Sequence, residues 1–318
     1  MTHWLFFGAV IIALAAVASL GDNYTLRLAT IVCMYSALAL SWNLIGGFAG
    51  YPSFATAAFF GLGAYSAGVL QTSGLSFALA WIGAGAVGTA FALLLGSAIL
   101  HLRGHYFAIA SLVVADVLRE VTNSWTGVTG GGMGMNLPII PIQGTANQAI
   151  FYFASMLFVA AIGVAVTLWT SSSRFGVALS CIEQNEDASP LIGIDTRRAK
   201  VAAFALAGMI ASLTGAVYAS WVTYIDPTDV YDVSLSVKPI IIALIGGVGT
   251  VVGPIIGAVV LLGLEEILWR SVLEFHAGLL GLLVVLLVLF LPGGVRTIKP
   301  FGVVALARRF FASRKVAG

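Results

Sequence analysis

Few side chains in this sequence are of types that carry out chemistry, and they are scattered. Among 318 residues there are 15 Lys and Arg, 13 Asp and Glu, 4 His and 2 Cys. His101 and His105 have the i, i+4 spacing of two metal ligands, but Gly104 lies between them and no third ligand is near. Cys33 lies in an apolar stretch and Cys181 in a polar one, so we expect two free thiols. The sequence therefore predicts neither a catalytic residue nor a metal site.

Patterns that bind phosphate or nucleic acid are missing as well. No segment contains a glycine-rich loop that ends in Gly-Lys-Ser or Gly-Lys-Thr, and no lysine follows a glycine. The net charge is only +2, and the basic residues form no stripe of the kind that binds nucleic acid. We therefore expect no cofactor on this chain. If ATP powers its activity, ATP and Mg²⁺ bind a partner chain.

The composition indicates a chain surrounded by lipid. Hydrophobic residues make up 60% of the sequence and charged residues 9%, whereas a soluble domain usually has about 25% charged residues. The mean hydropathy is +1.03. Soluble enzymes, disordered chains and secreted disulfide scaffolds are excluded. A bilayer core needs about 20 apolar residues per helix. Apolar windows near this length cover residues 4–20, 25–45, 54–70, 78–100, 105–120, 148–169, 201–224, 237–263 and 276–291.

The distribution of charge predicts the topology. Basic residues collect in loop 171–200 and in the C-terminal segment 296–318, so both are expected in the cytoplasm. Loop 121–147 has no charged residue and loop 226–236 has only acidic ones, so both belong on the other side. Counting windows back from loop 171–200 places the N-terminus in the cytoplasm too. No basic segment precedes the first window, so we expect it to be retained as a helix rather than cleaved as a signal peptide.

The same count requires an interrupted helix near the C-terminus. An outer loop at 226–236 and a cytoplasmic tail need an odd number of crossings between them, yet only two apolar windows remain. Window 237–263 contains four glycines and a proline between positions 246 and 254, so it is predicted to be broken or re-entrant. We expect an all-α polytopic membrane protein with about eight to ten spans. Residues 1–295 would form its transmembrane domain and residues 296–318 a basic cytoplasmic tail.

Two windows carry small residues at every fourth position, which places them along one face of a helix. Such seams allow helix backbones to approach closely in a membrane, so they predict tight packing inside the bundle more than a pore lining. The positions are Ala80, Ala84, Gly88, Ala92 and Gly96 in the first window and Ala203, Ala207, Ala211, Gly215 and Ala219 in the second.

Glycine clusters interrupt three apolar regions. The peptide Leu-Ile-Gly-Gly occurs at 44–47 and again at 244–247, each followed by a proline, and a third cluster covers 129–134. Paired Gly and Pro interruptions in two halves of a chain point to a transporter's substrate path, although such clusters also form ordinary turns. The predicted path residues are Gly46, Gly47, Ser53, Thr56, Thr129, Gly130, Gly246, Gly247 and Gly249.

Charged residues near the membrane fall into two groups. The first group, Arg103, Asp116, Arg119 and Glu120, is expected near the ends of its span. Asp116 can pair with Arg119 at i, i+3, so a structural ion pair is expected rather than an ion or proton relay. Glu266 begins an i, i+4, i+8 series with Arg270 and Glu274, which predicts a self-paired polar face on a short surface helix. Essentially no ionisable group is expected near the bilayer midplane, which argues against a self-sufficient secondary transporter.

Loop 171–200 has the composition of a docking segment. Ser189 and Pro190 suit the cap and first position of a helix, so two short helices with a break near residue 189 are expected. A simple linker would need no apolar side, yet this loop has one, which favours docking onto a partner over a merely solvated loop. Its apolar residues are Val177, Leu179, Ile182, Leu191, Ile192 and Ile194.

Several motifs occur in an order that resembles a known family. They lie at 50–65, 103–108, 129–134, 185–194, 200–218, 227–257 and 292–294. From about residue 35 to 295 the chain is similar to the LivM-type permease subunits of branched-chain amino acid ABC importers. It departs from their pattern at Ala55, Thr56, Glu183, Ser189, Pro190 and Lys238, the last standing where an acid is common.

The resemblance implies a multi-pass subunit of the bacterial inner membrane that performs no covalent chemistry. It would pair with a second, similar permease subunit, two cytoplasmic ATPases and a periplasmic solute-binding protein, and would import branched-chain or related amino acids by alternating access. Another small solute, such as urea or a sugar, is the alternative substrate. Within 171–200, the coupling loop, the residues expected to couple to the ATPase are Arg174, Gly176, Glu183, Asn185, Glu186, Asp187, Ala188 and Gly193.

Overall fold

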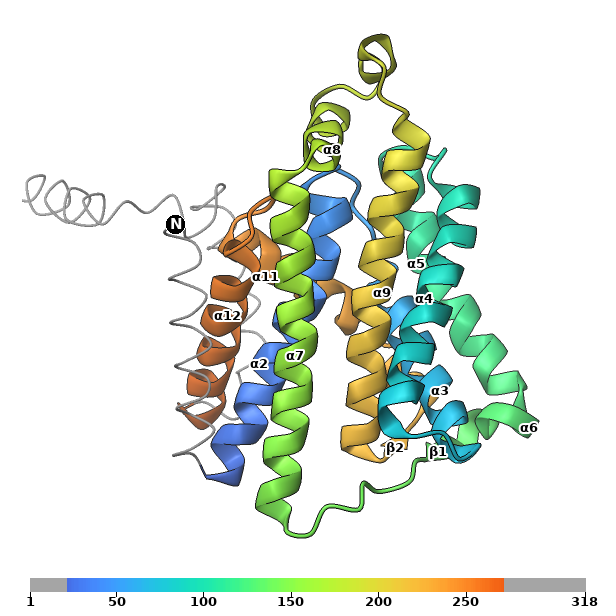
Figure 1. Cartoon of the computed structure of the whole chain (residues 1–318), viewed down its shortest axis with the longest axis vertical. Coiled ribbons are helices and arrows are strands. Elements are labelled where there is room, and N and C mark those ends of the chain that lie inside the picture. The colour runs from blue at the N-terminus through green and yellow to red at the C-terminus, as the bar shows by residue number, and fades with distance from the viewer. Residues whose placement is uncertain (1–21, 272–318) are drawn as a thin grey trace, which may run out of the picture.

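The computed structural model describes residues 22–271, which form a bundle of long helices that stand side by side (Figure 1). The long helices are α2 (Asn23–Trp42), α3 (Thr56–Thr72), α4 (Phe77–Ile99), α5 (His105–Ser124), α7 (Thr145–Ser172), α9 (Thr196–Val222) and α12 (Gly253–Ser271). The shorter elements are a π-helical turn (Asn43–Gly47), α6 (Thr126–Thr129), a 3-10 turn (Gly131–Met133), β1 (Met135–Asn136), α8 (Arg174–Gln184), a second 3-10 turn (Ser189–Ile192), β2 (Tyr224–Ile225), α10 (Pro227–Val230) and α11 (Ser234–Gly246).

The predicted all-α membrane fold is confirmed. In the part of the chain that the structure describes, four helices are long and apolar enough to cross a membrane: Asn23–Gly47, Phe77–Ile99, Thr145–Ser172 and Thr196–Val222. Their bounds agree with the apolar windows to within a few residues. The first and last windows and the basic tail lie outside the described residues.

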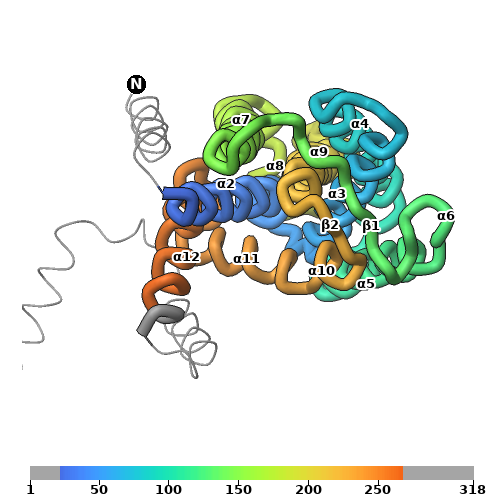
Figure 2. The backbone as a smooth tube through the Cα atoms, turned by 90° about the horizontal axis from the view of Figure 1, so that it is seen from below, coloured from blue at the N-terminus to red at the C-terminus, as the bar shows by residue number. Residues whose placement is uncertain are grey.

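Helix α2 occupies the middle of the bundle. The most apolar stretch of its span is 83% buried, and α7, α9, α11 and α12 all pack against it. Figure 2 shows α2 running between these four helices. A helix enclosed in this way contacts protein rather than lipid over most of its surface, which makes α2 the element against which the others are placed.

The small-residue seams lie at close helix contacts: the seam on α4 packs on α9, and a Cβ on Gly215 in the α9 seam would lie 2.0 Å from the Phe60 carbonyl oxygen on α3. On α4 the buried side is made of Ala80, Ala84, Gly85, Gly88, Ala92 and Gly96, whereas large neighbours such as Ile82 and Leu94 are exposed. A Cβ atom added to Gly88 would lie 1.9 Å from the Ser212 hydroxyl oxygen on α9. The prediction of close backbone packing is confirmed.

Window 237–263 is broken, as the crossing count required. It consists of α11 and α12, which form an antiparallel hairpin, and the chain reverses between them at Gly247 (φ 117°) and Gly249 (φ 71°). A Cβ on Gly246 would lie 1.8 Å from the Gly253 carbonyl oxygen, and one on Gly257 would lie 2.0 Å from that of Ile242. The glycines are needed because the two backbones touch.

The two loops predicted to share one side do share one end of the bundle. Strands β1 and β2 pair antiparallel, with Met135 opposite Ile225, and so join loop 121–147 to the segment after α9. Figure 1 shows them at the bottom, with α8 and the coupling loop at the top.

Two expectations about charged residues were wrong in position. Asp116 does pair with Arg119, at 3.2 Å, but it lies eleven residues into α5, about 16 Å along the helix and not near its end. Both side chains are exposed, 51% and 41%.

Glu266 belongs to the long helix α12 rather than to a short surface helix, since the apolar run continues from Gly253 without a break. The side chain of Arg270 and all of Glu274 lie outside the described residues.

The packing at Gly88 predicts a position-specific loss of stability. Replacing Gly88 by Ala forces α4 away from Ser212, and overpacking of this kind costs about 1–3 kcal/mol. We expect a lower midpoint of thermal unfolding for the purified protein in detergent. Gly263→Ala is the matched control, because nothing lies within 4 Å of a Cβ added there. Equal midpoints for the two variants would contradict close packing of α4 on α9 at Gly88.

Candidate functional site

The coupling loop begins with a sharp corner between α7 and α8. The Ser173 hydroxyl accepts a hydrogen bond from the Gly176 amide and caps α8. A Cβ on Gly176 would lie 1.9 Å from the Thr170 carbonyl oxygen. Gly176, one of the predicted coupling residues, is therefore buried in this corner and sets the angle at which α8 leaves the bundle.

The break in the loop lies at 185–188, and the second helix is only one 3-10 turn. The Asn185 side chain accepts a hydrogen bond from the Ala188 amide at 3.1 Å, a local bond that competes with helix continuation. The next turn starts at Ser189 with Pro190 in its second position, and Gly193 ends it with φ 84°. Two short helices with a break between them are therefore found as predicted, with the break just before residue 189 and the second helix limited to one 3-10 turn.

The apolar side of the loop divides into two parts. Leu179 and Ile182 pack into the protein core and are not free to contact a partner. Leu191 and Ile192, at the end of the loop farthest from the bundle, are 87% and 69% exposed. Val177 on α8 is exposed as well. The exposed apolar surface of the coupling loop therefore consists of its tip, Leu191 and Ile192, and of Val177 on α8.

An ion pair ties the loop to the bundle. The Lys200 ammonium lies 2.6 Å from one carboxylate oxygen of Glu186, and it donates hydrogen bonds of 2.8 Å to the Tyr51 hydroxyl and the Leu100 carbonyl oxygen. Tyr51 in turn donates to the second oxygen of Glu186. Lys200 is only 3% exposed. Glu186 of the loop, Tyr51 of the α2–α3 connection and the Leu100 carbonyl at the end of α4 thus converge on the Lys200 ammonium, and we call this cluster the Glu186 anchor.

Arg103 adds an outer layer to the anchor. Its guanidinium lies 3.6 Å from Glu186 and 2.8 Å from the Asp187 carboxylate. Both Arg103 and Asp187 are exposed, and exposed pairs of this kind contribute about 0–1 kcal/mol. The orientation of the loop therefore depends mainly on the inner contacts with Lys200 and Tyr51.

The anchor keeps Glu186 ionised. Burial alone would raise the pKa of its carboxyl, but the hydrogen bonds from Lys200 and Tyr51 and the charges of Lys200 and Arg103 outweigh burial and lower the pKa below 4.5. A carboxyl whose pKa is lowered in the docked loop stabilises docking fully at pH values above its free pKa. That contribution is lost only as the pH falls through the lowered pKa.

The predicted coupling residues are placed in three ways. Gly176 is buried in the α7–α8 corner, and Glu186 faces the bundle instead of a partner. The others are exposed: Arg174, Glu183, Asn185, Asp187, Ala188 and Gly193.

The two Leu-Ile-Gly-Gly segments meet at the same end of the bundle. The fully buried Asn43 side chain accepts a hydrogen bond from the Gly249 amide and donates one to the Thr250 carbonyl oxygen, each 2.8 Å. A Cβ on Gly47 would lie 2.7 Å from the Gly249 nitrogen. We call residues 43–53 and 246–250 the glycine junction. It adjoins the coupling loop, since a Cβ on Gly50 would lie 2.9 Å from the Glu183 side chain.

The structure brings together only part of the predicted path. The glycine junction contains Gly46, Gly47, Ser53, Gly246, Gly247 and Gly249. Thr56 is buried at the start of α3, next to it. Thr129 and Gly130 lie at the opposite end, where a Cβ on Gly130 would lie 2.2 Å from the Gly134 carbonyl oxygen. The third cluster therefore forms a separate turn near β1, and a role in transport stays a prediction for all of these residues.

Three functional features were not found from the sequence. The first is the ion pair of Glu186 with Lys200. The second is the pair of hydrogen bonds that the Asn43 amide makes within the glycine junction. The third is an ion pair between Lys238 on α11 and Glu265 on α12, 3.0 Å apart. For Lys238 the available signal was a lysine inside an apolar stretch, because such a residue needs a partner, whereas Lys200 follows two arginines and gave no such signal.

A buried anchor for a loop with an apolar tip, joined to an apolar helix bundle, is the arrangement expected of a subunit moved by another protein. The model of a family described as the permease component of the branched-chain amino acid transport system matches residues 24–291. The chain belongs to this family. As one of these permease components it is a multi-pass membrane protein and a transport subunit rather than an enzyme.

The permease is similar to several curated proteins. It is 25% identical to the high-affinity branched-chain amino acid transport system permease LivM of Escherichia coli strain K12, over 92% of this chain and 74% of LivM. The corresponding permease LivH of Salmonella typhimurium is 21% identical over 84% of this chain and 92% of LivH. The ribose import permease RbsC of Haemophilus influenzae is 27% identical over 48% of this chain and 49% of RbsC. No solved structure matches the permease.

The lowered pKa of Glu186 predicts a loop whose docking is insensitive to pH over a wide range. Amide hydrogen exchange of residues 185–193, corrected for intrinsic rates, is expected to be equally slow at pH 8 and pH 5.5, because the carboxyl stays ionised at both. Glu186→Gln should speed exchange at both pH values. Wild-type exchange that accelerates between pH 8 and pH 5.5 would be inconsistent with the anchor.

Proposed function

We propose that this permease forms the membrane path of an ATP-binding-cassette importer for branched-chain or related apolar amino acids. ATP would be bound and hydrolysed by two separate cytoplasmic chains, and a periplasmic solute-binding protein would deliver the substrate. The proposal places the protein in a bacterial inner membrane with both termini in the cytoplasm. Family membership and the similarity to LivM over most of the chain support it.

The observation that carries the coupling proposal is the exposed tip of a clamped loop. Leu191 and Ile192 project from the end of the molecule where the basic loop residues predict the cytoplasm. The Glu186 anchor holds this loop against three parts of the bundle. A pull on the tip would therefore reach α9 through Lys200 and the glycine junction through Tyr51, in a rigid-body change that opens the path alternately to the two sides.

A second permease subunit is proposed on the exposed face of α5. Asp116 and Arg119 lie on this helix about 16 Å and about 21 Å from its start, and both side chains are exposed. Charged side chains at membrane depth do not face lipid; they face protein or a water-filled cavity. The LivM-like and LivH-like similarities are consistent with a pair of related permeases around a common path.

The substrate class is best tested with the complete transporter. Complexes isolated with a tagged chain from native membranes are reconstituted with the binding protein, and uptake of leucine, isoleucine and valine is compared with uptake of ribose and urea. Amino acid uptake that depends on ATP supports the proposal. Ribose uptake would favour the second candidate, a sugar permease, which the RbsC similarity motivates. A chain that purifies alone and transports alone would overturn the importer proposal in favour of a secondary transporter.

The loop tip should be required for ATPase binding. In the double variant Leu191→Ser and Ile192→Ser, apolar contact area is lost without a buried residue being changed, so the chain should still insert. We expect at least about tenfold less co-purifying ATPase and a similar loss of uptake, since two apolar anchors of an interface are removed. Val233→Ser, an exposed apolar position outside the coupling loop, is the control. Undiminished ATPase recovery from the double variant would rule out the tip as the docking surface.

The anchor should transmit the motion of the tip. Glu186→Arg places a third cation beside Lys200 and Arg103, so the loop is repelled from the bundle instead of being held to it. The exposed tip is unchanged, so the complex should still assemble, but ATP hydrolysis should no longer drive uptake. Combining Glu186→Lys with Lys200→Glu restores opposite charges and should recover part of the uptake. Unchanged uptake in Glu186→Arg vesicles would show that the anchor has no part in coupling.

A further inference from the structure

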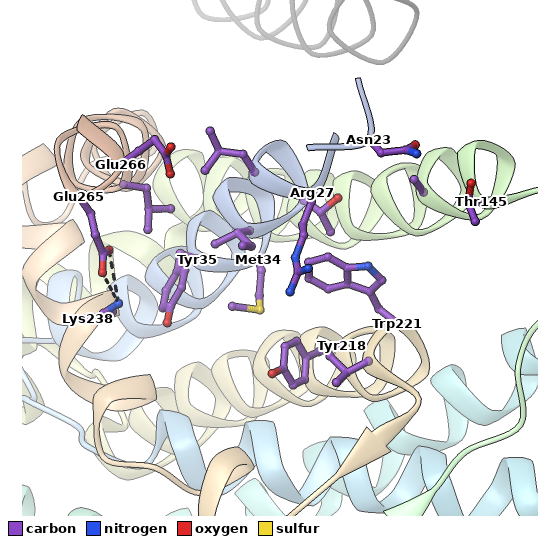
Figure 3. A pocket seen from close by; sticks show the side chains of 16 residues that line it. Asn23, Arg27, Met34, Tyr35, Thr145, Tyr218, Trp221, Lys238, Glu265 and Glu266 are labelled. Carbon is purple, nitrogen blue, oxygen red and sulfur yellow. Dashed lines mark hydrogen bonds and ion pairs between the residues drawn. The ribbon is translucent and has the colours of Figure 1, made fainter. Parts of the chain in front are cut away.

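A cavity of about 780 Å³ lies at the end of the bundle opposite the coupling loop. Its walls come from α2, α7, α9, α11 and α12 (Figure 3). Asn23, Thr145 and Val222, which lie at the helix ends, form its rim, and Tyr35 lies at its inner end. Twelve residues of α2 separate Asn23 from Tyr35, which corresponds to a depth of about 18 Å. We call this space the outer pocket.

The inner end of the outer pocket holds two opposite charges. The Lys238 ammonium lies 3.0 Å from the Glu265 carboxylate, and their side chains are 32% and 29% exposed. This ammonium also lies 5.5 Å from the centre of the Tyr35 ring. The ion pair is thus accessible from the pocket and is not sealed in the core. An incoming charged group can reach either partner.

Further polar and apolar groups surround this pair. Arg27 lines the pocket nearer the rim, and Figure 3 shows its guanidinium beside Trp221. Within residues 22–271 no ion pair is formed by Arg27, and the Tyr35 hydroxyl has no hydrogen-bond partner. Met34 and Leu262 supply apolar wall between the charges and the rim. A second carboxylate, that of Glu266, also lines the pocket and accepts a hydrogen bond from the Tyr24 hydroxyl. The pocket therefore offers two cations, two carboxylates and an apolar surface at once.

We propose that the outer pocket binds an apolar amino acid in its zwitterionic form. The carboxylate would bind Lys238, with Arg27 as the second cation, the ammonium group would bind Glu265, and the aliphatic side chain would lie against Met34 and Leu262. This inference rests on the proposed function for its substrate class, and it adds a binding site within this subunit.

The charges favour a zwitterion over a singly charged solute. Separating Lys238 from Glu265 leaves two unpaired charges, each with a desolvation cost. A zwitterion supplies a new partner for both, whereas an anion satisfies only Lys238 and a cation only Glu265. A sugar supplies neither charge. The headgroup of phosphatidylethanolamine shares the chemistry of an ammonium beside an anion, so it is the other source that an experiment must separate.

The test uses the purified complete complex in lipid nanodiscs without the binding protein. Equilibrium binding of radiolabelled leucine is measured with two competitors. One is 4-methylpentanoate, which lacks the ammonium group of leucine, and the other is 3-methylbutylamine, which lacks the carboxylate. We expect saturable leucine binding, competition at least tenfold weaker from both analogues, and at least a tenfold loss of affinity in Lys238→Met and in Glu265→Gln. The matched control is Asp195→Asn with Arg198→Gln, an ion pair at the other end of α9.

A charge swap separates binding from a structural role of the pair. Lys238→Glu with Glu265→Lys keeps the pair between α11 and α12 but reverses the charges presented to the ligand. Thermal stability should recover while leucine affinity stays low. Recovery of both would show that the pair only holds the hairpin together and would overturn the inference.

Two other outcomes would also overturn it. Wild-type leucine affinity in both single variants would exclude the pocket. Leucine binding that appears only when phosphatidylethanolamine is replaced by phosphatidylglycerol in the nanodiscs would identify a lipid headgroup as the occupant. Failure of the inference is distinct from failure of the proposed function, because wild-type complexes with the binding protein would still import leucine in the first case and would not in the second.

Discussion

One buried ammonium group, that of Lys200, joins the coupling loop of this permease to its helix bundle. Lys200 is buried in the first turns of α9, where an unpaired charge is costly, and Glu186, Tyr51 and the Leu100 carbonyl together satisfy it. These groups come from the coupling loop, the α2–α3 connection and the end of α4. Because removing any one of them weakens the environment of the same ammonium, the loop, the central helix and α9 are mechanically linked.

Away from this end, cohesion comes from close backbone approach rather than from charge. Lipid provides little hydrophobic drive for helices to associate, so α3, α4 and α9 pack where glycine and alanine let their backbones touch. Hydroxyl groups then bond across the contact: Ser212 donates to the Phe59 carbonyl oxygen at 2.9 Å, and Ser41 on α2 donates to that of Ala207 at 2.7 Å. The bundle therefore combines tight helix contacts with two charged clusters, the Glu186 anchor at one end and the Lys238–Glu265 pair deep inside the outer pocket.

Sequence alone predicts the parts of this structure that a single helix determines. The apolar windows, the seam on α4 and the break in window 237–263 follow from residues a few positions apart, and all three were found. The polar contacts were not, because their partners are distant in the chain: Lys200 is 14 residues from Glu186, Lys238 is 27 from Glu265, and Asn43 is 207 from Thr250. Glu186 was identified as a coupling residue through family resemblance. Its orientation toward the bundle could not be predicted, since an exposed and a buried carboxylate look alike in a sequence.

The Asn43 amide has a consequence for the order in which the protein is built. During synthesis α2 enters the membrane long before α11 and α12 exist, so this side chain waits in the bilayer without its two partners at Gly249 and Thr250. An unsatisfied amide in a low-dielectric medium is unfavourable, which means that α2 reaches its final position only when the C-terminal hairpin arrives. A chain that ends before residue 246 lacks both partners of the Asn43 amide, whereas a full-length chain supplies them. The polar group that closes the finished bundle thus also distinguishes a complete chain from a truncated one.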